Sequence, residues 1–253
     1  GGGSSYDLAL ATWHLALDRK IPVMPIMVVT PKTATYLAEG VRFFIEELNA
    51  KAFSISPDLK ADWPADAQAK MTSQFEDVLT QVKARYLAGR PVTISMFDEK
   101  IRSRKLRGKP VRARCRFGKG KISVATDGAI FPCEIIGSSM PGELCIGQAG
   151  QPLDEQRIVD FKRTLATPAS ECEGCEYVAQ CHFWCGCKRF LGAGTLTDIP
   201  EALCFFQKLS CRLADRLTDD LLAARCRAYY AEYCVPERIK KVIAWLKRPW
   251  RRR

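Results

Sequence analysis

The N-terminal part of the chain alternates between two kinds of hydrophobic pattern. Apolar side chains recur at helical spacing over residues 6–19, 33–49 and 65–88, which predicts three helices that each bury one face. Residues 22–29 and 52–55 are short apolar runs, as expected of strands buried in a parallel sheet. The order of helix, strand, helix and strand predicts an α/β fold, either a barrel or an open parallel sheet.

The middle of the chain carries the alternation of an antiparallel strand pair. Residues 121–132 alternate around Asp127-Gly128, which predicts a β-hairpin with this dipeptide at its turn. Glycine suits the turn because Gly128 can adopt a positive φ angle without strain. Further helices are predicted over residues 154–165 and 200–230.

A polar and basic stretch over residues 97–110 predicts a domain boundary. We therefore expect an α/β segment over residues 1–96, a second domain over 97–234 and a basic C-terminal tail over 235–253.

Composition is that of an ordinary globular protein: 253 residues, 47% apolar and 26% charged. No apolar run is long enough to cross a bilayer, and no signal-peptide pattern is visible, so we expect a cytoplasmic protein without a membrane partner. In that compartment the twelve cysteines should be reduced, and a pattern of reduced cysteines usually indicates a metal. Only His14 and His182 are histidines, which nearly excludes a His-rich zinc site.

The net charge of +11 gathers in residues 102–121 and 238–253, where basic residues follow one another without an acid. Such runs can bind nucleic acid, but no nucleic-acid-binding fold signature accompanies them, so we expect solvated surfaces and no nucleic-acid partner. Within the first run, Arg112, Arg114 and Arg116 could also stabilise an anionic metal cluster.

Seven cysteines form a ladder with regular spacing, C-x12-G-x4-C, then C-x2-C-x5-C-x3-C, then a final C. They are Cys115, Cys133, Cys172, Cys175, Cys181, Cys185 and Cys204, and the glycine is Gly128. Seven thiolates exceed the needs of one tetrahedral metal and suit two four-coordinate sites. Among metal sites that are bound by many cysteines and by no other residue type, iron–sulfur clusters are the commonest. Zinc on the same thiols is an alternative.

This ladder resembles the SPASM domain of radical S-adenosylmethionine (SAM) enzymes, over roughly Cys115 to Cys204. The resemblance implies an α/β fold: the C-terminal part of a partial (β/α) barrel, then an α+β iron–sulfur domain with a β-hairpin and a C-terminal helix. It also implies two auxiliary [4Fe–4S] clusters. One would be held by Cys115, Cys133 and Cys185, and the other by Cys172, Cys175, Cys181 and Cys204.

The fourth ligand of the first cluster is left open by the sequence. Members of the family often carry a further cysteine upstream of the ladder, but no cysteine precedes Cys115. Four alternatives remain for this fourth position: Cys145, Cys187, a group other than cysteine, or an iron with no protein ligand. The other cysteines, Cys211, Cys226 and Cys234, are interpreted as small buried apolar residues.

The C-x3-C-x2-C motif that binds the SAM-cleaving cluster in this family is absent. The chain thus resembles the C-terminal portion of such an enzyme, or one half of a split one. SAM and a third [4Fe–4S] cluster are expected only if a missing N-terminal part completes it. Whether the chain by itself is an enzyme stays open, and no catalytic or SAM-binding residue is assigned.

Three functions are compatible with the ladder. By resemblance, the chain is part of a maturase that modifies a peptide or protein, with its clusters binding substrate or transferring electrons. Its partners would then be that substrate, a separate N-terminal radical SAM half and a reductant such as flavodoxin or ferredoxin. The alternatives are a non-catalytic iron–sulfur module for electron transfer or peptide binding, and a zinc module.

Overall fold

The computed structural model describes residues 4–107, 115–137, 142–236 and 239. Arg112, Arg114 and nearly all of the expected basic tail, 235–253, lie outside the described residues.

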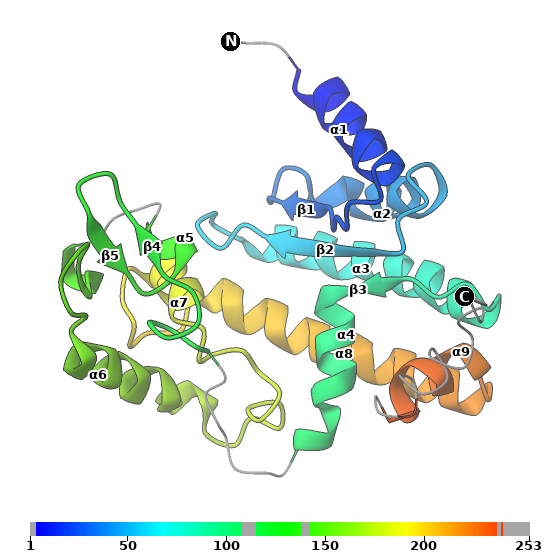
Figure 1. Ribbon diagram of the computed structural model, residues 1–253. Helices are drawn as coiled ribbons and strands as arrows, with labels where there is room; N and C mark the ends of the chain where they lie inside the picture. The colour runs from blue at the N-terminus through cyan, green and yellow to red at the C-terminus, as the bar shows by residue number, and fades with distance from the viewer. Residues whose placement is uncertain (1–3, 108–114, 138–141, 237–238, 240–253) are drawn as a thin grey trace.

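A three-stranded parallel sheet forms the N-terminal layer (Figure 1). Its strands are β1 (Ile26–Val29), β2 (Ala52–Pro57) and β3 (Thr93–Ile94), in the order β1-β2-β3. The helices before and between them are α1 (Tyr6–Asp18), α2 (Leu37–Glu46) and α3 (Ala65–Leu87). The α/β prediction is therefore confirmed. β1 begins four residues later than the predicted strand 22–29, and β3 was not predicted, because two residues are too few to show a period.

The main hydrophobic core lies between this sheet and the helices α3, α4 (Ser95–Ser103) and α8 (Glu201–Ala223). Phe53 of β2, Phe75 of α3, Phe97 of α4 and Leu213 of α8 are all buried in it. The expected boundary at residues 96/97 falls inside α4, and α4 packs against α8 and β2. Parts of the two expected domains thus share one core, while the division itself stays a prediction.

A small antiparallel sheet confirms the predicted hairpin. β4 (Ser123–Val124) pairs with β5 (Ala129–Phe131), which pairs with β6 (Gly147–Gln148). Gly128 has a φ of +86°, as the turn requires. A Cβ there would also lie 2.5 Å from Nε2 of Gln148, which donates a hydrogen bond to the Asp127 carbonyl. Glycine at this position is needed for both the turn angle and the close packing.

Around the small sheet lie α5 (Glu134–Gly137), α6 (Glu155–Ala166) and α7 (Gly186–Ala193). Single-turn segments complete the description: the 3-10 helices η1 (Ala34–Tyr36), η2 (Arg104–Leu106), η3 (Gly142–Leu144) and η4 (Ser170–Cys172). None of the helices in the described ranges is long and apolar enough to cross a membrane.

The predicted single helix over residues 200–230 is wrong at its C-terminal end. α8 ends at Ala223, and Arg225 adopts a left-handed φ of 48°, which breaks the helical hydrogen bonding. A short helix α9 (Arg227–Tyr229) and a π-helical turn η5 (Tyr230–Cys234) follow. The fold thereby places Tyr233 beside Tyr86 of α3, with a hydrogen bond of 3.1 Å between their hydroxyls.

Candidate metal centres

One group of thiols gathers where the small sheet meets α7. We call Cys115, Cys133, Cys185 and Cys187 the hairpin thiols. The Sγ atoms of Cys185 and Cys187 lie 3.3 Å apart, and the Cys187 thiol also hydrogen-bonds Cys133. Cys115 lies close enough to interact electrostatically with Cys133 and Cys185. The structure thus brings together three ladder residues and one cysteine outside the ladder.

The hairpin thiols differ in acidity. Hydrogen bonding to Cys187, whose single S–H can be donated to Cys133 or to Cys185, lowers the pKa of each to about 6, helped by backbone N–H groups at the start of α5 and α7. The same hydrogen bonds raise the pKa of Cys187. Burial raises the pKa of Cys115. Because thiolates are the metal-binding form, the hydrogen bond from Cys187 favours that form at Cys133 or at Cys185.

A second group of thiols gathers at the start of α8. We call Cys172, Cys175, Cys181 and Cys204 the knuckle thiols. Cys172 interacts electrostatically with Cys175, Cys181 and Cys204. The turn between the first two is closed by a 3.2 Å hydrogen bond from Cys175 N to Cys172 O, with Gly174 at a φ of +70°. Burial raises the pKa of Cys172 and raises that of Cys181 to about 12.

The remaining cysteines are engaged elsewhere or stand apart. The Cys145 thiol donates to the Gly147 carbonyl at 3.3 Å, and the Cys226 thiol donates to the Tyr86 carbonyl at the same distance. Cys211 is fully buried in α8, and Cys226 is buried as well. Both fit the interpretation as small core residues, whereas Cys234 is exposed, contrary to that interpretation.

Two cations are buried around the knuckle thiols, and neither forms a direct ion pair with a carboxylate in the described part of the chain, although Glu99 acts on Lys100 and Asp198 on Arg189 at longer range. Lys100 is 1% exposed, and its Nζ donates to Gln180 O at 2.9 Å and to Gln207 Oε1 at 2.6 Å. Arg189, also 1% exposed, donates only to carbonyl oxygens, among them Phe183 O and Leu196 O. Both cations interact electrostatically with Cys181.

The buried cations provide a test of whether an iron–sulfur cluster fits here. A buried charge is costly unless an opposite charge compensates it, and a [4Fe–4S] centre with four thiolates is anionic. Cations also accompany the hairpin thiols, where Arg116 and Lys121 line a hollow together with Cys115 and Cys133. The donor sets and their charged surroundings therefore fit two such clusters.

No three His, Cys, Asp or Glu side chains among the described residues are arranged to hold a single metal ion. A four-iron cluster requires a different arrangement of side chains, because each thiolate binds a different iron.

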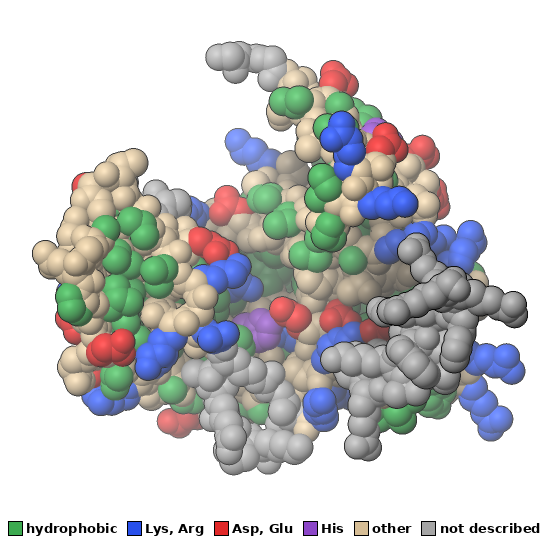
Figure 2. Space-filling view, viewed as in Figure 1, with side chains coloured by type: hydrophobic (Ala, Val, Ile, Leu, Met, Phe, Trp, Pro, Cys, Tyr) green, Lys and Arg blue, Asp and Glu red, His purple; other side chains and the backbone are tan. Residues whose placement is uncertain are grey.

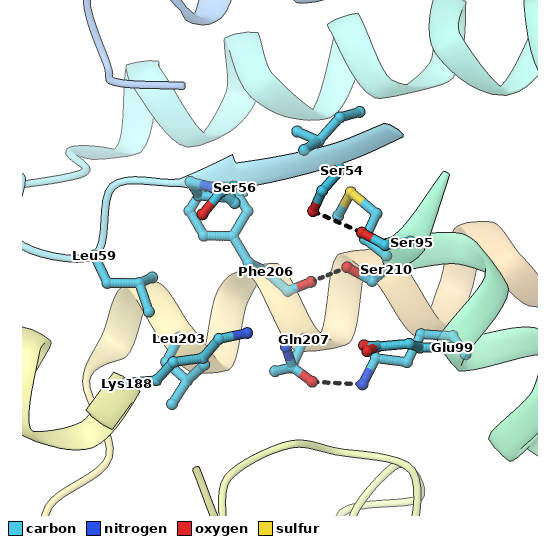
Figure 3. A pocket seen from close by; sticks show the side chains of 14 residues that line it. Ser54, Ser56, Leu59, Ser95, Glu99, Lys188, Leu203, Phe206, Gln207 and Ser210 are labelled. Atoms are coloured by element: carbon cyan, nitrogen blue, oxygen red, sulfur yellow. Dashed lines mark hydrogen bonds between the residues drawn. The ribbon is translucent and has the colours of Figure 1, made fainter. Parts of the chain in front are cut away.

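A cavity of about 260 Å³ lies between β2, α4, α7 and α8 (Figure 3). Ser54 and Ser56 face it from β2, and the Ser54 hydroxyl lies 2.7 Å from that of Ser95, which directly follows β3. Lys188 reaches it from α7, and Glu99 faces it from α4 on the opposite side. Parallel sheets commonly bind ligands at the carboxyl ends of their strands, which is where this cavity opens.

Sequence analysis did not single out these cavity residues. A signal existed for the serines, because Ser54 and Ser56 alternate with the buried Phe53 and Ile55 along β2. For Glu99, Lys100 and Lys188 no motif marks the position, since each reaches the cavity only through tertiary packing.

His182 also lies beside the cavity. Its Nδ1 is 3.3 Å from Oε2 of Glu99, and its ring contacts that of Trp184 at a centroid distance of 4.8 Å. His182 therefore contacts both a carboxylate that lines the cavity and a neighbouring aromatic ring.

A comparison with models of protein families finds no match, and a comparison with curated proteins finds none either. Among solved structures, the chain is similar to polyhistidine-tagged anSMEcpe with bound AdoMet, at 18% identity and a TM-score of 0.62, over 90% of this chain and 63% of that one. It is also similar to native anSMEcpe with bound AdoMet and the Cp18Cys peptide, at 17% identity and a TM-score of 0.64, over 87% of this chain and 63% of that one.

These structures are of an anaerobic sulfatase-maturating enzyme, which is a radical SAM/SPASM enzyme. At such low identity the likeness shows the fold alone. The chain therefore has the fold of part of a radical SAM enzyme, and it spans less than two thirds of the structures it resembles.

Proposed function

We propose that this chain is the C-terminal part of a radical SAM/SPASM enzyme that modifies a peptide or protein. We further propose that Cys115, Cys133 and Cys185 hold one auxiliary [4Fe–4S] cluster and that the knuckle thiols hold another. The observation that carries the proposal is the gathering of the ladder cysteines into two thiol groups, in a chain that has a cavity at the carboxyl ends of its parallel strands and a fold similar to part of the anSMEcpe structures.

The cavity is suited to a peptide. The hydroxyls of Ser54, Ser56 and Ser95 can hydrogen-bond amide groups, and Lys188 and Glu99 offer one charge of each sign to a side chain or terminus. One of the similar structures contains a bound peptide, which supports a peptide substrate for this chain.

When bound, iron–sulfur clusters supply single-electron transfer or, at an iron without a protein ligand, a place for substrate to bind. The chain's own residues would position and insulate them. Phe183, which lies midway in sequence between the knuckle cysteine Cys181 and the hairpin cysteine Cys185, is fully buried and would help to exclude water. Lys100 and Arg189 would compensate the negative charge of the knuckle cluster.

A SAM-cleaving cluster would have to come from another part of the enzyme, because its C-x3-C-x2-C motif is absent from this sequence. The edge of the parallel sheet supports such a partner or preceding segment. Ile26 and Val28 of β1 are 60% and 63% exposed, and Figure 2 shows hydrophobic side chains gathered over β1 and α1. An edge strand with an apolar face is a place where further strands can pair.

The direct test is anaerobic reconstitution of the chain with iron and sulfide. We expect about eight iron and eight sulfide per chain, the broad charge-transfer absorption of iron–sulfur clusters and, after reduction, an electron paramagnetic resonance (EPR) signal from each cluster. A colourless protein that binds only zinc would overturn the proposal in favour of a zinc module.

A second measurement separates an enzyme part from an electron-transfer module. The reconstituted chain is mixed with a candidate N-terminal half that carries C-x3-C-x2-C, together with SAM, a reductant and peptide. Modification of the peptide only when both halves are present supports the enzyme.

A further inference from the structure

We propose that Cys187, which lies outside the cysteine ladder, is the fourth protein ligand of the hairpin-thiol cluster. The inference rests on the proposed function, because it presupposes a cluster at Cys115, Cys133 and Cys185.

The position of the Cys187 thiol carries the argument. Cys187 is 5% exposed, and its Sγ lies 3.3 Å from that of Cys185 while it hydrogen-bonds Cys133. Cys133 follows the hairpin and Cys185 precedes α7, so the thiol sits between ladder cysteines from two different segments. The Cys187 thiol therefore lies beside two of the three ladder thiols of this group.

The start of α7 explains how two cysteines separated by one residue can serve one site. Residues two apart inside a helix do not face each other. Cys185, however, is the residue before the helix, with an extended backbone at φ −81° and ψ 101°, and Cys187 lies in the first turn. The change of backbone direction between them brings the two side chains together.

Gly186 fixes this turn against the core. A Cβ on Gly186 would lie 2.9 Å from Cδ1 of Leu165 and 2.9 Å from Cε2 of Phe117. Phe117 is buried two residues after Cys115. The glycine therefore allows the Cys185–Cys187 turn to pack directly onto the segment that carries Cys115.

The other candidates for the fourth ligand are engaged elsewhere. The Cys145 thiol donates to the Gly147 carbonyl in β6 at 3.3 Å. The carboxylate of Glu134, next to Cys133, is paired with Lys121 at 3.0 Å. All twelve cysteines lie in the described ranges, so no further thiol is left to consider.

The assignment changes the role of the hairpin cluster. With four cysteines, every iron of a [4Fe–4S] cluster has a protein ligand, and none is left for substrate. Substrate binding then falls to the cavity residues, and the hairpin thiols serve electron transfer.

The experiment compares Cys187→Ala with Cys145→Ala, a control at a cysteine packed against the same core. Both variants and the wild type are reconstituted anaerobically and freed of small thiols. We expect Cys145→Ala to match the wild type. Cys187→Ala should lose either about one iron, with a [3Fe–4S] EPR signal in the oxidised protein, or about four, with the knuckle cluster retained.

If Cys187→Ala does not fold, Cys187→Ser tests whether residue 187 is a ligand of the cluster. A serine ligand leaves one iron bound through oxygen, which gives that iron a distinct Mössbauer signature. Wild-type iron content and spectra in both Cys187 variants would overturn the inference and leave Cys187 as a hydrogen-bond donor only. Absence of any cluster from the wild type would instead be a failure of the proposed function.

Discussion

The ammonium group of Lys100 lies buried between the cavity and the knuckle thiols, held by Gln180 O and Gln207 Oε1. Burial lowers the pKa of Lys100, whereas the nearby Cys211 and Cys181 act in the opposite sense. Without a compensating anion such a charge destabilises the fold, and with an anionic cluster beside it the charge becomes favourable. The same residue should therefore affect the metal-free and the loaded protein differently.

We expect Lys100→Met to destabilise the loaded protein by about 1–3 kcal/mol, because it removes a donor from the buried Gln180 carbonyl and leaves Gln207 Oε1 with only the His182 backbone N–H. It should also make the knuckle cluster harder to reduce, since a nearby positive charge is lost. In metal-free protein the loss should be smaller, because removing an uncompensated buried charge offsets it. Thermal unfolding and EPR-monitored redox titration measure both effects. Equal destabilisation with and without metal would contradict a charge-balancing role for Lys100.

The thiol pKa values predict an order of chemical reactivity in metal-free protein. The pKa of Cys133 is lowered to about 6, and that of Cys181 is raised to about 12. At pH 7.5, brief treatment with iodoacetamide should label Cys133 well before Cys181, as read by mass spectrometry. Prior loading with iron and sulfide should suppress labelling of both. Faster labelling of Cys181 in folded protein would show that its thiolate is not disfavoured by burial.

The sign of the pH dependence follows from the same shifts. An unfolded cysteine has a pKa of about 8.5. Because the folded pKa of Cys133 lies below this value, its contribution to the stability of the metal-free protein is present above about pH 8.5 and is lost as the pH falls through about 6.

Helices α7 and α8 connect the thiol groups to the rest of the fold. α7 packs against α5, which follows Cys133, and against α8, which carries Cys204. Sequence patterns predicted α8 because its apolar positions recur over many turns. They did not predict α7, which is eight residues long and interleaved with cysteines, so its hydrophobic period is hidden.

The same reasoning explains which parts of the candidate site were accessible from sequence. The spacing of the ladder depends on local geometry, and thiols of each predicted set lie near one another, while their role as two sets of cluster ligands stays a prediction. Cys187 and the cavity residues depend on packing between distant segments. Their roles could not be read from spacing, because nothing in the local sequence distinguishes Cys187 from Cys145.

Two cysteines on α8 provide a test at this scale. Cys204 lies in the first turn of the helix, and Cys211 lies about two turns further along, roughly 10 Å away at 1.5 Å per residue. We expect Cys204→Ala to lose the knuckle cluster, about four iron per chain, and to lower the melting temperature markedly. Cys211→Ala should keep its iron and cost about 1 kcal/mol, as for a small cavity in the core. Iron analysis and melting curves of both variants show which of the two cysteines the knuckle cluster needs. Equal iron losses would mean that Cys211 also takes part in the site.

At the scale of the whole molecule, the chain has part of a radical SAM fold without the motif that cleaves SAM. We expect reconstituted chain, incubated with SAM and dithionite, to form no 5′-deoxyadenosine above a metal-free control. The physical reason is that the C-x3-C-x2-C loop is absent, while the ladder cysteines and Cys187 are proposed to hold two other clusters. Product formation in this assay, abolished by removing the knuckle thiols, would contradict that division of roles.

The exposed face of β1 has a consequence for how the protein must be made. Its backbone edge and its Ile26 and Val28 side chains offer a template to which any extended apolar segment can add, including β1 of another copy. A chain produced in excess over a segment that covers this strand is thus at risk of aggregating. Synthesis of the covering segment at the same time and in a matching amount would protect the chain. Supply of that segment is then a condition for solubility as well as for chemistry.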